Sequence, residues 1–369
     1  MMDSMAPFSD PVLSQRSAET VIQLAKQYTI KTGRKPVFME VCGSHTMALA
    51  KTGVKTRLKD YVRLIAGPGC PVCVTDQKTI DSMISLSEDP RRILCTFGDM
   101  VRVPGSKHSL MDAKTEGKDI RIVYSPLDSL RIAEENPDRE IVFLGIGFET
   151  TIPLLAAAIK EAEKRGLNNF TIWMTTKLVE PVLRSLLEAG EIHLDGFLLP
   201  GHVSIVLGKE SYSFLAEEYK MPGVISGFEP VQLLSSIYKL LQLCLEKKAD
   251  IINDYPYIVS EKGNLSSQSL MQEYLKHADE DWRGIGTIPS SGMVLKEEFE
   301  KFDAKKKFKV ITEPPRKTKC RCGEVIRGLV EPEKCVLFKK ACTPSNPIGP
   351  CMVSAEGTCA AHYHYMREE

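Results

Sequence analysis

The stretch EIVFLGIGFETTIPLLAAAIKEAEKRG, residues 140–166, contains the pattern on which the fold depends. Its first eight residues form a short apolar run, which is typical of a strand buried on both faces of a parallel sheet. Residues 150–166 follow at once and are helix-like. A buried strand that leads directly into a helix is the repeating unit of α/β proteins.

The same alternation of apolar runs and helix-like segments extends from about residue 36 to residue 245. The other runs are short, and most are rich in β-branched or aromatic residues: PVFMEV, VRLIAG, RRILCTF, IRIVY, FTIWMTT, DGFLLPG and GVISG. Helix-like segments such as EPVQLLSSIYKLLQLCLEKK separate many of them. The pattern predicts an α/β fold with parallel sheets.

A weak internal repeat divides this region. Gly147, Phe148 and Glu149 in GIGFETTIPLL recur 80 residues later, as GFE in VISGFEPVQLL (224–234). A chance match is the alternative, but a true repeat predicts two similar α/β domains around a cleft, and such clefts hold ligands. We expect a helical segment at 1–35 that packs on the third domain, α/β domains at 36–150 and 151–250, and a third domain at 251–369.

The composition excludes several classes of function. The 369 residues are 43% hydrophobic and 26% charged, and 48 Lys and Arg balance 48 Asp and Glu, so the net charge predicts no nucleic-acid binding. The N-terminus lacks the features of a signal peptide, and no apolar run reaches the roughly 20 residues of a membrane helix. We expect a cytoplasmic protein that does not bind membranes.

Eleven cysteines are many for such a protein, and in a reducing compartment they favour metal binding or redox chemistry. Six lie in the last fifty residues: Cys320, Cys322, Cys335, Cys342, Cys351 and Cys359. There is no pair of CxxC knuckles, and the wide spacing favours an iron–sulfur cluster held by loops over zinc or no metal. Spacing alone does not show which four cysteines bind metal.

Four other reactive residues follow predicted strands, at the edge where open parallel sheets hold their functional groups. Cys42 precedes His45 in CGSHT, and Cys70 lies with Cys73 in GPGCPVC. Glu149 follows the run at 140–147, and His202 follows FLLPG. We interpret Cys70 and Cys73 as a redox dithiol, with half a zinc site or a structural turn as alternatives. The other three have plainer alternatives: a buried thiol, a helix N-terminal charge and a core histidine.

The motifs together resemble the HypD family of hydrogenase maturation factors. They are CGSHT (42–46), GPGCPVC (67–73), GFETT (147–151), PGHVS (200–204) and a tail of the form C-x14-C-x6-C-x16-C. The resemblance covers residues ~35 to 365. It implies two similar α/β domains, a third domain holding a [4Fe–4S] cluster, and a role in assembling the Fe(CN)2CO group of [NiFe] hydrogenases.

The resemblance also implies partners and roles for single residues. A small chaperone, HypC, would share the iron with Cys42, and HypE would deliver cyanide. His45 would lie beside the iron, which carries CN and CO only transiently on this chain, and Glu149 and His202 would line the cleft. The cluster ligands would be Cys320, Cys335, Cys342 and Cys359. Cys322 and Cys351 would pass electrons toward Cys70 and Cys73.

Two functions of other classes stay open on sequence alone. One is a stand-alone iron–sulfur-dependent dithiol/disulfide oxidoreductase, which would need no HypC. The other is a zinc-stapled binding module, in which Cys70 and Cys73 are structural.

Overall fold

Two separate parallel sheets carry the strands that the sequence predicts. The computed structural model describes residues 6–310, 312, 314–315 and 318–366. The sheet of the first lobe has the order β2-β1-β7-β8-β9, and the sheet of the second lobe has the order β4-β3-β5-β6. The predicted α/β class with parallel sheets is confirmed. The strands are β1 (Val37–Glu40), β2 (Arg63–Ala66), β3 (Arg92–Thr96), β4 (Ile120–Ile122), β5 (Glu140–Gly147), β6 (Phe170–Thr176), β7 (Gly196–Pro200), β8 (Gly223–Ser226) and β9 (Ile251–Asn253).

Helices fill the connections between the strands. Those of the first 250 residues are α1 (Pro11–Thr32), α2 (Gly43–Lys51), α3 (Val54–Leu58), α4 (Pro71–Val74), α5 (Gln77–Leu86), α6 (Leu110–Thr115), α7 (Asp128–Glu135), α8 (Ile152–Lys164), α9 (Val179–Ala189), α10 (Gly201–Leu207), α11 (Ser213–Glu217) and α12 (Pro230–Glu246). Later come α13 (Leu265–Tyr274), α14 (Ala304–Lys307), α15 (Cys322–Val325) and α16 (Thr358–Tyr365). Short 3-10 turns are η1 (Ala6–Ser9), η2 (Gly98–Arg102), η3 (Glu210–Tyr212), η4 (Glu297–Phe302), η5 (Pro332–Lys334) and η6 (Pro350–Met352). Among the helices of the described ranges, none has both the length and the apolar character to cross a bilayer.

Two separate segments of the chain form the first lobe, which differs from the predicted division into consecutive domains. β5 pairs with β6 across residue 150, whereas β1 and β2 join a sheet completed by β7, β8 and β9. The chain crosses to the second lobe between β2 and β3 and returns between β6 and β7. The predicted boundary at 150 therefore does not separate the sheets. An apolar run predicts a buried strand but carries no information about which sheet it joins.

The two copies of Gly-Phe-Glu occupy equivalent places in the two lobes. One lies between β5 and α8, and the other lies between β8 and α12. A Cβ on Gly147 would lie 2.3 Å from Cβ of Thr151, and a Cβ on Gly227 would lie 2.2 Å from Oε1 of Gln232. In both lobes, glycine is required because the first turn of the following helix packs against the end of the strand.

An antiparallel hairpin that the sequence did not predict belongs with the second lobe. β10 (Leu275–Trp282) pairs with β11 (Gly286–Leu295). Thr176 at the end of β6 fixes it, since its hydroxyl donates to the carbonyl of Met293 (3.0 Å) and accepts from the Met293 amide (2.8 Å). The predicted third domain at 251–369 thus divides: β9 completes the first sheet, the hairpin joins the second lobe, and only the segment from about residue 318, here called the tail, is the cysteine-rich unit.

The N-terminal helix is present as predicted, but its packing differs from the prediction. α1 packs on α12 of the first lobe, through a face that includes Val21, Ala25 and Tyr28. The Tyr28 hydroxyl donates to Asp195 Oδ1 at 2.9 Å. α1 therefore covers the first lobe instead of the third domain.

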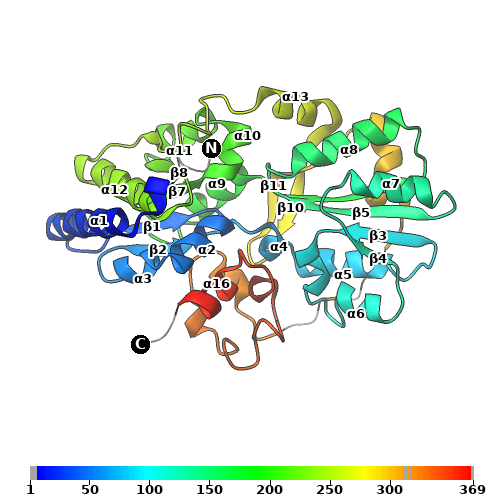
Figure 1. The fold of residues 1–369 in the computed structure, drawn as a ribbon, viewed down its shortest axis with the longest axis horizontal. Coiled ribbons are helices and arrows are strands. Elements are labelled where there is room, and N and C mark those ends of the chain that lie inside the picture. The colour runs from blue at the N-terminus through cyan, green and yellow to red at the C-terminus, as the bar shows by residue number, and fades with distance from the viewer. Residues whose placement is uncertain (1–5, 311, 313, 316–317, 367–369) are drawn as a thin grey trace.

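The lobes and the tail share one apolar core. Figure 1 shows the lobes side by side, the hairpin between them, and the tail (orange to red) below their junction. One cluster of buried residues includes Met39 of the first sheet, Val142 of the second, Trp282 of the hairpin and Phe338 of the tail. The junction where these parts meet also holds most of the predicted site residues.

Candidate functional site

The loops that carry Cys42 and Cys70 lie directly against each other. Cys42 follows β1 and caps α2, while Cys70 follows β2 and caps α4. The Gly43 amide donates to the carbonyl of Gly69 at 3.0 Å. A Cβ on Gly69 would lie 2.4 Å from the backbone nitrogen of Cys42, so only glycine allows this approach. The adjacent, parallel strands β1 and β2 therefore bring the two thiol loops together, as their places in the sequence suggest.

Cys42 is a buried thiol in a polar setting. Burial raises its pKa to about 11, although hydrogen bonds from the amides of His45 and Ser44 act in the opposite direction. The charge of Glu356, a tail residue, raises the pKa further. The Ser44 hydroxyl donates to Glu356 Oε1 at 2.5 Å, which holds this carboxylate beside the start of α2. Cys42 is therefore a protonated thiol at neutral pH unless a metal displaces the proton.

His45 is a neutral imidazole locked by the end of β8. Its Nε2 lies 3.2 Å from the carbonyl of Ser226 and 3.1 Å from that of Gly227, so Nε2 carries the proton. Burial lowers its pKa to about 4. Within the described chain, Nδ1 is buried without a hydrogen-bond partner. This leaves one nitrogen lone pair available beside the Cys42 loop.

His202 approaches the same place from α10 and shares an aromatic contact with His45. Its ring stacks on Phe228 with centroids 4.0 Å apart, and the His45 ring lies 4.7 Å from Phe228. Partial burial lowers the pKa of His202, while the charge of Glu356 raises it. Phe228 belongs to the second copy of Gly-Phe-Glu, so that copy positions both histidines.

Glu149 lies on the second lobe, between β5 and α8. Its Oε1 accepts from the Val179 amide at 2.8 Å, while Oε2 is buried without a partner in the described chain. Burial raises its pKa to about 7. Glu149 lines a pocket of about 540 Å³ that also includes His277. Burial raises the pKa of Tyr212, and the charges of Glu149 and Cys42 raise this pKa further. Tyr212 therefore interacts electrostatically with both Glu149 and Cys42.

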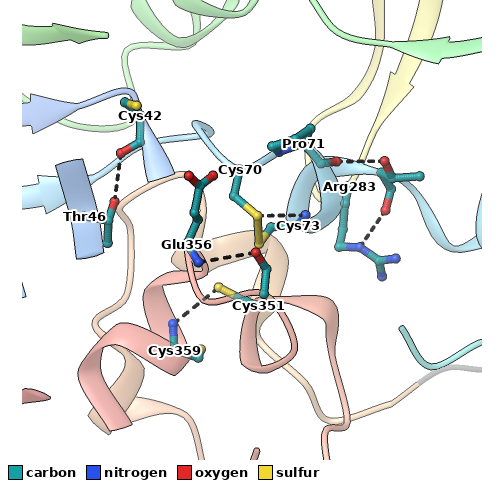
Figure 2. Close-up of a disulfide and its surroundings, with 11 residues drawn as sticks. Cys42, Thr46, Cys70, Pro71, Cys73, Arg283, Cys351, Glu356 and Cys359 are labelled. Carbon is teal, nitrogen blue, oxygen red and sulfur yellow. Dashed lines mark hydrogen bonds between the residues drawn. A yellow bond between two sulfur atoms is a disulfide. The ribbon is translucent and has the colours of Figure 1, made fainter. Parts of the chain in front are cut away.

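Cys70 and Cys73 form a disulfide at the N-terminus of α4, and both are buried. The Cys73 amide donates to Sγ of Cys70 at 3.2 Å. η6, which contains Cys351, packs against α4. Figure 2 shows this disulfide between Cys42 on one side and the tail residues Cys351 and Cys359 on the other.

The tail cysteines gather in one group. Side-chain hydrogen bonds connect four thiols in a row, from Cys320 to Cys322, Cys351 and Cys359. Cys342 interacts electrostatically with Cys320 and Cys335, and Cys359 does so with Cys320 and Cys342. The four cysteines predicted to bind a cluster are thus neighbours, and Cys351 lies on the side of the group that faces α4.

A second polar group, where the tail meets Lys55 of α3, resembles a metal site but contains its own cation. Ligand atoms of Glu331, Glu333 and His362 lie within 4.8 Å of one another. His362 Nδ1 contacts Glu333 Oε1 at 2.7 Å, and Lys55 Nζ lies 3.3 Å from His362 Nε2. The Lys55 ammonium already contacts the second nitrogen of the His362 imidazole. This group is therefore an ion-pair network that fixes the tail on α3.

Sequence reasoning missed several residues of the junction. Glu356 lies in AEGTC, where no motif marks it. Lys177 follows β6 and is fully buried, with Nζ 3.1 Å from Glu280 Oε1 on β10. A charged residue at the end of an apolar strand was a signal that could have identified Lys177. Glu356 has no such signal, since its role depends on the tail reaching Cys42.

Fold and site together define a class of protein: a two-lobed α/β protein that gathers thiols from two strand ends and a cysteine-rich tail at one junction. Comparison with known proteins identifies the family. The HypD family model, described as "Hydrogenase formation hypA family", matches residues 16–366. The chain is 41% identical over 366 residues to hydrogenase maturation factor HypD of Escherichia coli, covering 96% of this chain and 97% of the relative.

Two further relatives match over almost their whole length. HypD2 of Bradyrhizobium diazoefficiens is 43% identical over 366 residues, covering 95% of this chain and 96% of the relative. HypD of Rhodobacter capsulatus is 42% identical over 371 residues, covering 99% and 98%. This chain therefore belongs to the HypD family of hydrogenase maturation factors, which confirms the resemblance seen in its motifs.

Proposed function

We propose that this chain is the scaffold and redox protein on which the Fe(CN)2CO group of [NiFe] hydrogenases is assembled. The observation that carries the proposal is the meeting of Cys42, the Cys70–Cys73 disulfide and the tail thiols at one junction. This arrangement supports a site that holds iron at one end and receives electrons from the other.

Cys42 would bind the iron that is being assembled, together with a cysteine of a HypC-type chaperone. A thiolate is a soft donor, which suits ferrous iron carrying cyanide and CO. Since burial keeps Cys42 protonated, binding of iron would release its proton. The neutral His45, the nearby His202 and Glu356 are the groups available to accept it, and burial keeps bulk water from the metal.

The tail would hold a [4Fe–4S] cluster through Cys320, Cys335, Cys342 and Cys359. The donor set fits such a group, because the four thiols are neighbours and the amide of Ile348 donates to Cys342 Sγ at 3.4 Å. Hydrogen bonds of this kind tune the potential of a cluster. When bound, the cluster would supply single electrons.

Cys322 and Cys351 would connect the tail with the disulfide of α4. Cys351 lies on η6 against α4, and it contacts Cys322 and Cys359 through thiol hydrogen bonds. Reduction would turn the Cys70–Cys73 disulfide into two thiols beside Cys42. A HypE-type partner would deliver cyanide to iron held there.

The cluster is tested by metal analysis of protein purified without oxygen. We expect iron and acid-labile sulfide in a ratio near one, and a reduced sample with an electron paramagnetic resonance signal typical of a [4Fe–4S] centre. Zinc in place of iron and sulfide would overturn this part of the proposal.

Cys42→Ala tests the iron site separately from the cluster. We expect this variant to retain iron and sulfide in the tail but to lose the infrared bands of cyanide and CO in the complex with HypC. Cys244→Ala is the matched control, because Cys244 is a half-buried thiol on α12 that contacts the carbonyl of Asp195. Cyanide and CO bands of normal strength in Cys42→Ala would exclude Cys42 as the iron ligand.

The disulfide in α4 also favours a second candidate, a stand-alone dithiol/disulfide oxidoreductase. Such an enzyme would reduce a disulfide substrate without HypC, and Cys70→Ser would abolish its activity while Cys42→Ala would not. The infrared spectrum of the HypC complex separates the two functions, since only the scaffold carries cyanide and CO.

A further inference from the structure

A pocket of about 600 Å³ opens beside the tail thiols of Cys320 and Cys322. Three parts of the chain form it: the loop at 104–107 of the second lobe, Arg283 and Gly284 at the hairpin turn, and the tail around Cys320, Cys322 and 346–349. Two of the tail cysteines therefore border this pocket.

Cys320 gives this pocket access to the thiols. Of the six tail cysteines, all of which the structure describes, only Cys320 is partly exposed, and the other five are buried. Gly349 lies against its sulfur, since a Cβ on Gly349 would be 2.7 Å from Sγ of Cys320. From Cys320 the row of thiol contacts continues to Cys322 and Cys351 and reaches α4. An electron donor would come nearest to the thiols here.

The walls of the pocket are cationic. Among the described residues that line it are Arg283 and Lys107 but no Asp or Glu. Lys107 is exposed, and Lys319, the neighbour of Cys320 in the chain, is exposed as well.

Hydrogen bonds with the residues that follow Cys73 hold Arg283 in the pocket. Its amide donates to the carbonyl of Val74 (2.8 Å), and its Nε donates to the carbonyl of Thr75 (2.9 Å). Nη1 reaches Gln77 Oε1 at 3.2 Å, while Nη2 is buried without a hydrogen-bond partner in the described chain. Arg283 also interacts electrostatically with Cys320 and Cys322. Figure 2 shows it beside α4. One guanidinium thus touches the dithiol segment and faces the tail thiols.

We propose that this pocket is the docking site of a small acidic one-electron carrier protein that supplies electrons, by way of the tail, to the α4 disulfide. Charge complementarity selects the partner, because the cationic side chains of Arg283, Lys107 and Lys319 at this opening attract an acidic surface. The proposal rests on the redox role proposed above. Two reduced carriers each give one electron and are oxidised, the Cys70–Cys73 bond breaks, and two protons from water complete the two thiols.

The test uses reduced flavodoxin, an acidic one-electron carrier, as the probe under anaerobic conditions. Its reoxidation is followed by absorbance in stopped flow, and the new thiols at Cys70 and Cys73 are counted by alkylation and mass spectrometry. We expect Lys107→Glu and Lys319→Glu to slow the reaction about 3- to 10-fold at low ionic strength and to converge on the wild-type rate at high salt. Lys164→Glu, the same charge change on the exposed C-terminal turn of α8, leaves the rate unchanged.

Two controls separate this proposal from the redox role itself. Reduction by dithionite needs no docking, so all three variants are expected to match the wild type with it. If dithionite generates no thiols at Cys70 and Cys73, the redox role fails. If dithionite does so but flavodoxin does not react, or reacts equally with every variant, the docking proposal is overturned. Inhibition by phosphate beyond that of chloride at equal ionic strength would assign the pocket to a small anion and would also overturn it.

Discussion

Glu40 is a buried carboxyl that costs stability when it ionises. It ends β1, and its side chain is 1% exposed. Burial raises its pKa to about 7, although the Lys55 ammonium acts in the opposite direction. The folded state therefore binds this proton more tightly than the unfolded state. The resulting stabilisation is complete below about pH 4.5 and is lost as the pH rises through 7.

We expect Glu40→Gln to gain stability relative to the wild type as the pH rises. The difference in free energy of unfolding should change by about 1–3 kcal/mol in favour of Glu40→Gln between pH 5 and pH 8. Thermal unfolding at several pH values measures it. Glu163→Gln, at an exposed position of α8, is the control and should give a difference that does not vary with pH. A pH-independent difference for Glu40→Gln would contradict the prediction.

Gly69 is the residue that lets the two thiol loops touch. In Gly69→Ala the new methyl group would overlap the backbone of Cys42, and backbone cannot yield as a flexible side chain can. We expect a loss of about 2–4 kcal/mol of stability and faster alkylation of Cys42. Gly98→Ala is the matched control, because the nearest atom to its new methyl group is 3.8 Å away. Equal unfolding curves for the two variants would show that the loops separate freely.

Sequence reasoning reached the site where a residue's place on a strand decides its surroundings. Cys42 and Cys70 follow neighbouring strands, so their meeting could be predicted from the edge rule alone. The hydrogen-bond partners of His45 could not be predicted, because Ser226 and Gly227 reach it only after the chain returns from the second lobe. Glu356 was hidden for the same reason: its contact with Ser44 spans 312 residues.

At the scale of elements, Asp195 anchors α1 to the first lobe. It accepts hydrogen bonds from the Tyr28 hydroxyl, the Arg34 guanidinium and the Val37 amide. Burial opposes its ionisation, but these donors outweigh burial and lower its pKa. The carboxylate therefore stabilises the fold above its unfolded pKa near 4, and this stabilisation is lost as the pH falls below that value.

We expect Asp195→Ala to lower the free energy of unfolding by about 2–3 kcal/mol at pH 7, because three donors, two of them on the buried residues Tyr28 and Val37, lose their acceptor. Limited proteolysis should cut within α1 more readily, and the difference from the wild type should shrink below pH 4. Asp60→Ala, at an exposed position after α3, should change neither. A fully protected α1 in Asp195→Ala would show that its apolar face alone suffices.

Sequence reasoning failed to predict elements whose structure depends on a pairing partner and not on a pattern in their own residues. The eight apolar runs all became strands of the parallel sheets, and most of them are largely buried there; β4, at the edge of its sheet, is the exception. β10, with the sequence LKHADEDW, is polar and exposed along much of its length, so its residues give no strand signal. It is a strand because β11 pairs with it, and β11 is held by Thr176 of the second lobe. Contacts of this kind are not encoded locally.

At the scale of the molecule, the shared core predicts that the tail and the lobes unfold together. Phe338 of the tail is 6% exposed and belongs to the same cluster as Trp282 of the hairpin and Met39 of the first sheet. A tail that docked only as a separate module would bury its apolar residues among themselves. Because this tail buries its apolar residues against both lobes, a destabilising substitution in the tail should also destabilise the lobes.

Phe338→Ala tests this coupling with a nearby control, Val336→Ala. Removing the buried ring should cost about 3 kcal/mol, whereas Val336 is 60% exposed and should cost little. We expect the unfolding transition seen by tryptophan fluorescence, which reports on Trp173 and Trp282, to move to lower temperature by the same amount as the transition seen by circular dichroism. A fluorescence transition that stays in place while the dichroism signal acquires an earlier step would mean that the tail unfolds by itself. In that case the packing that holds the tail thiols beside α4 would be weaker than the packing within the lobes.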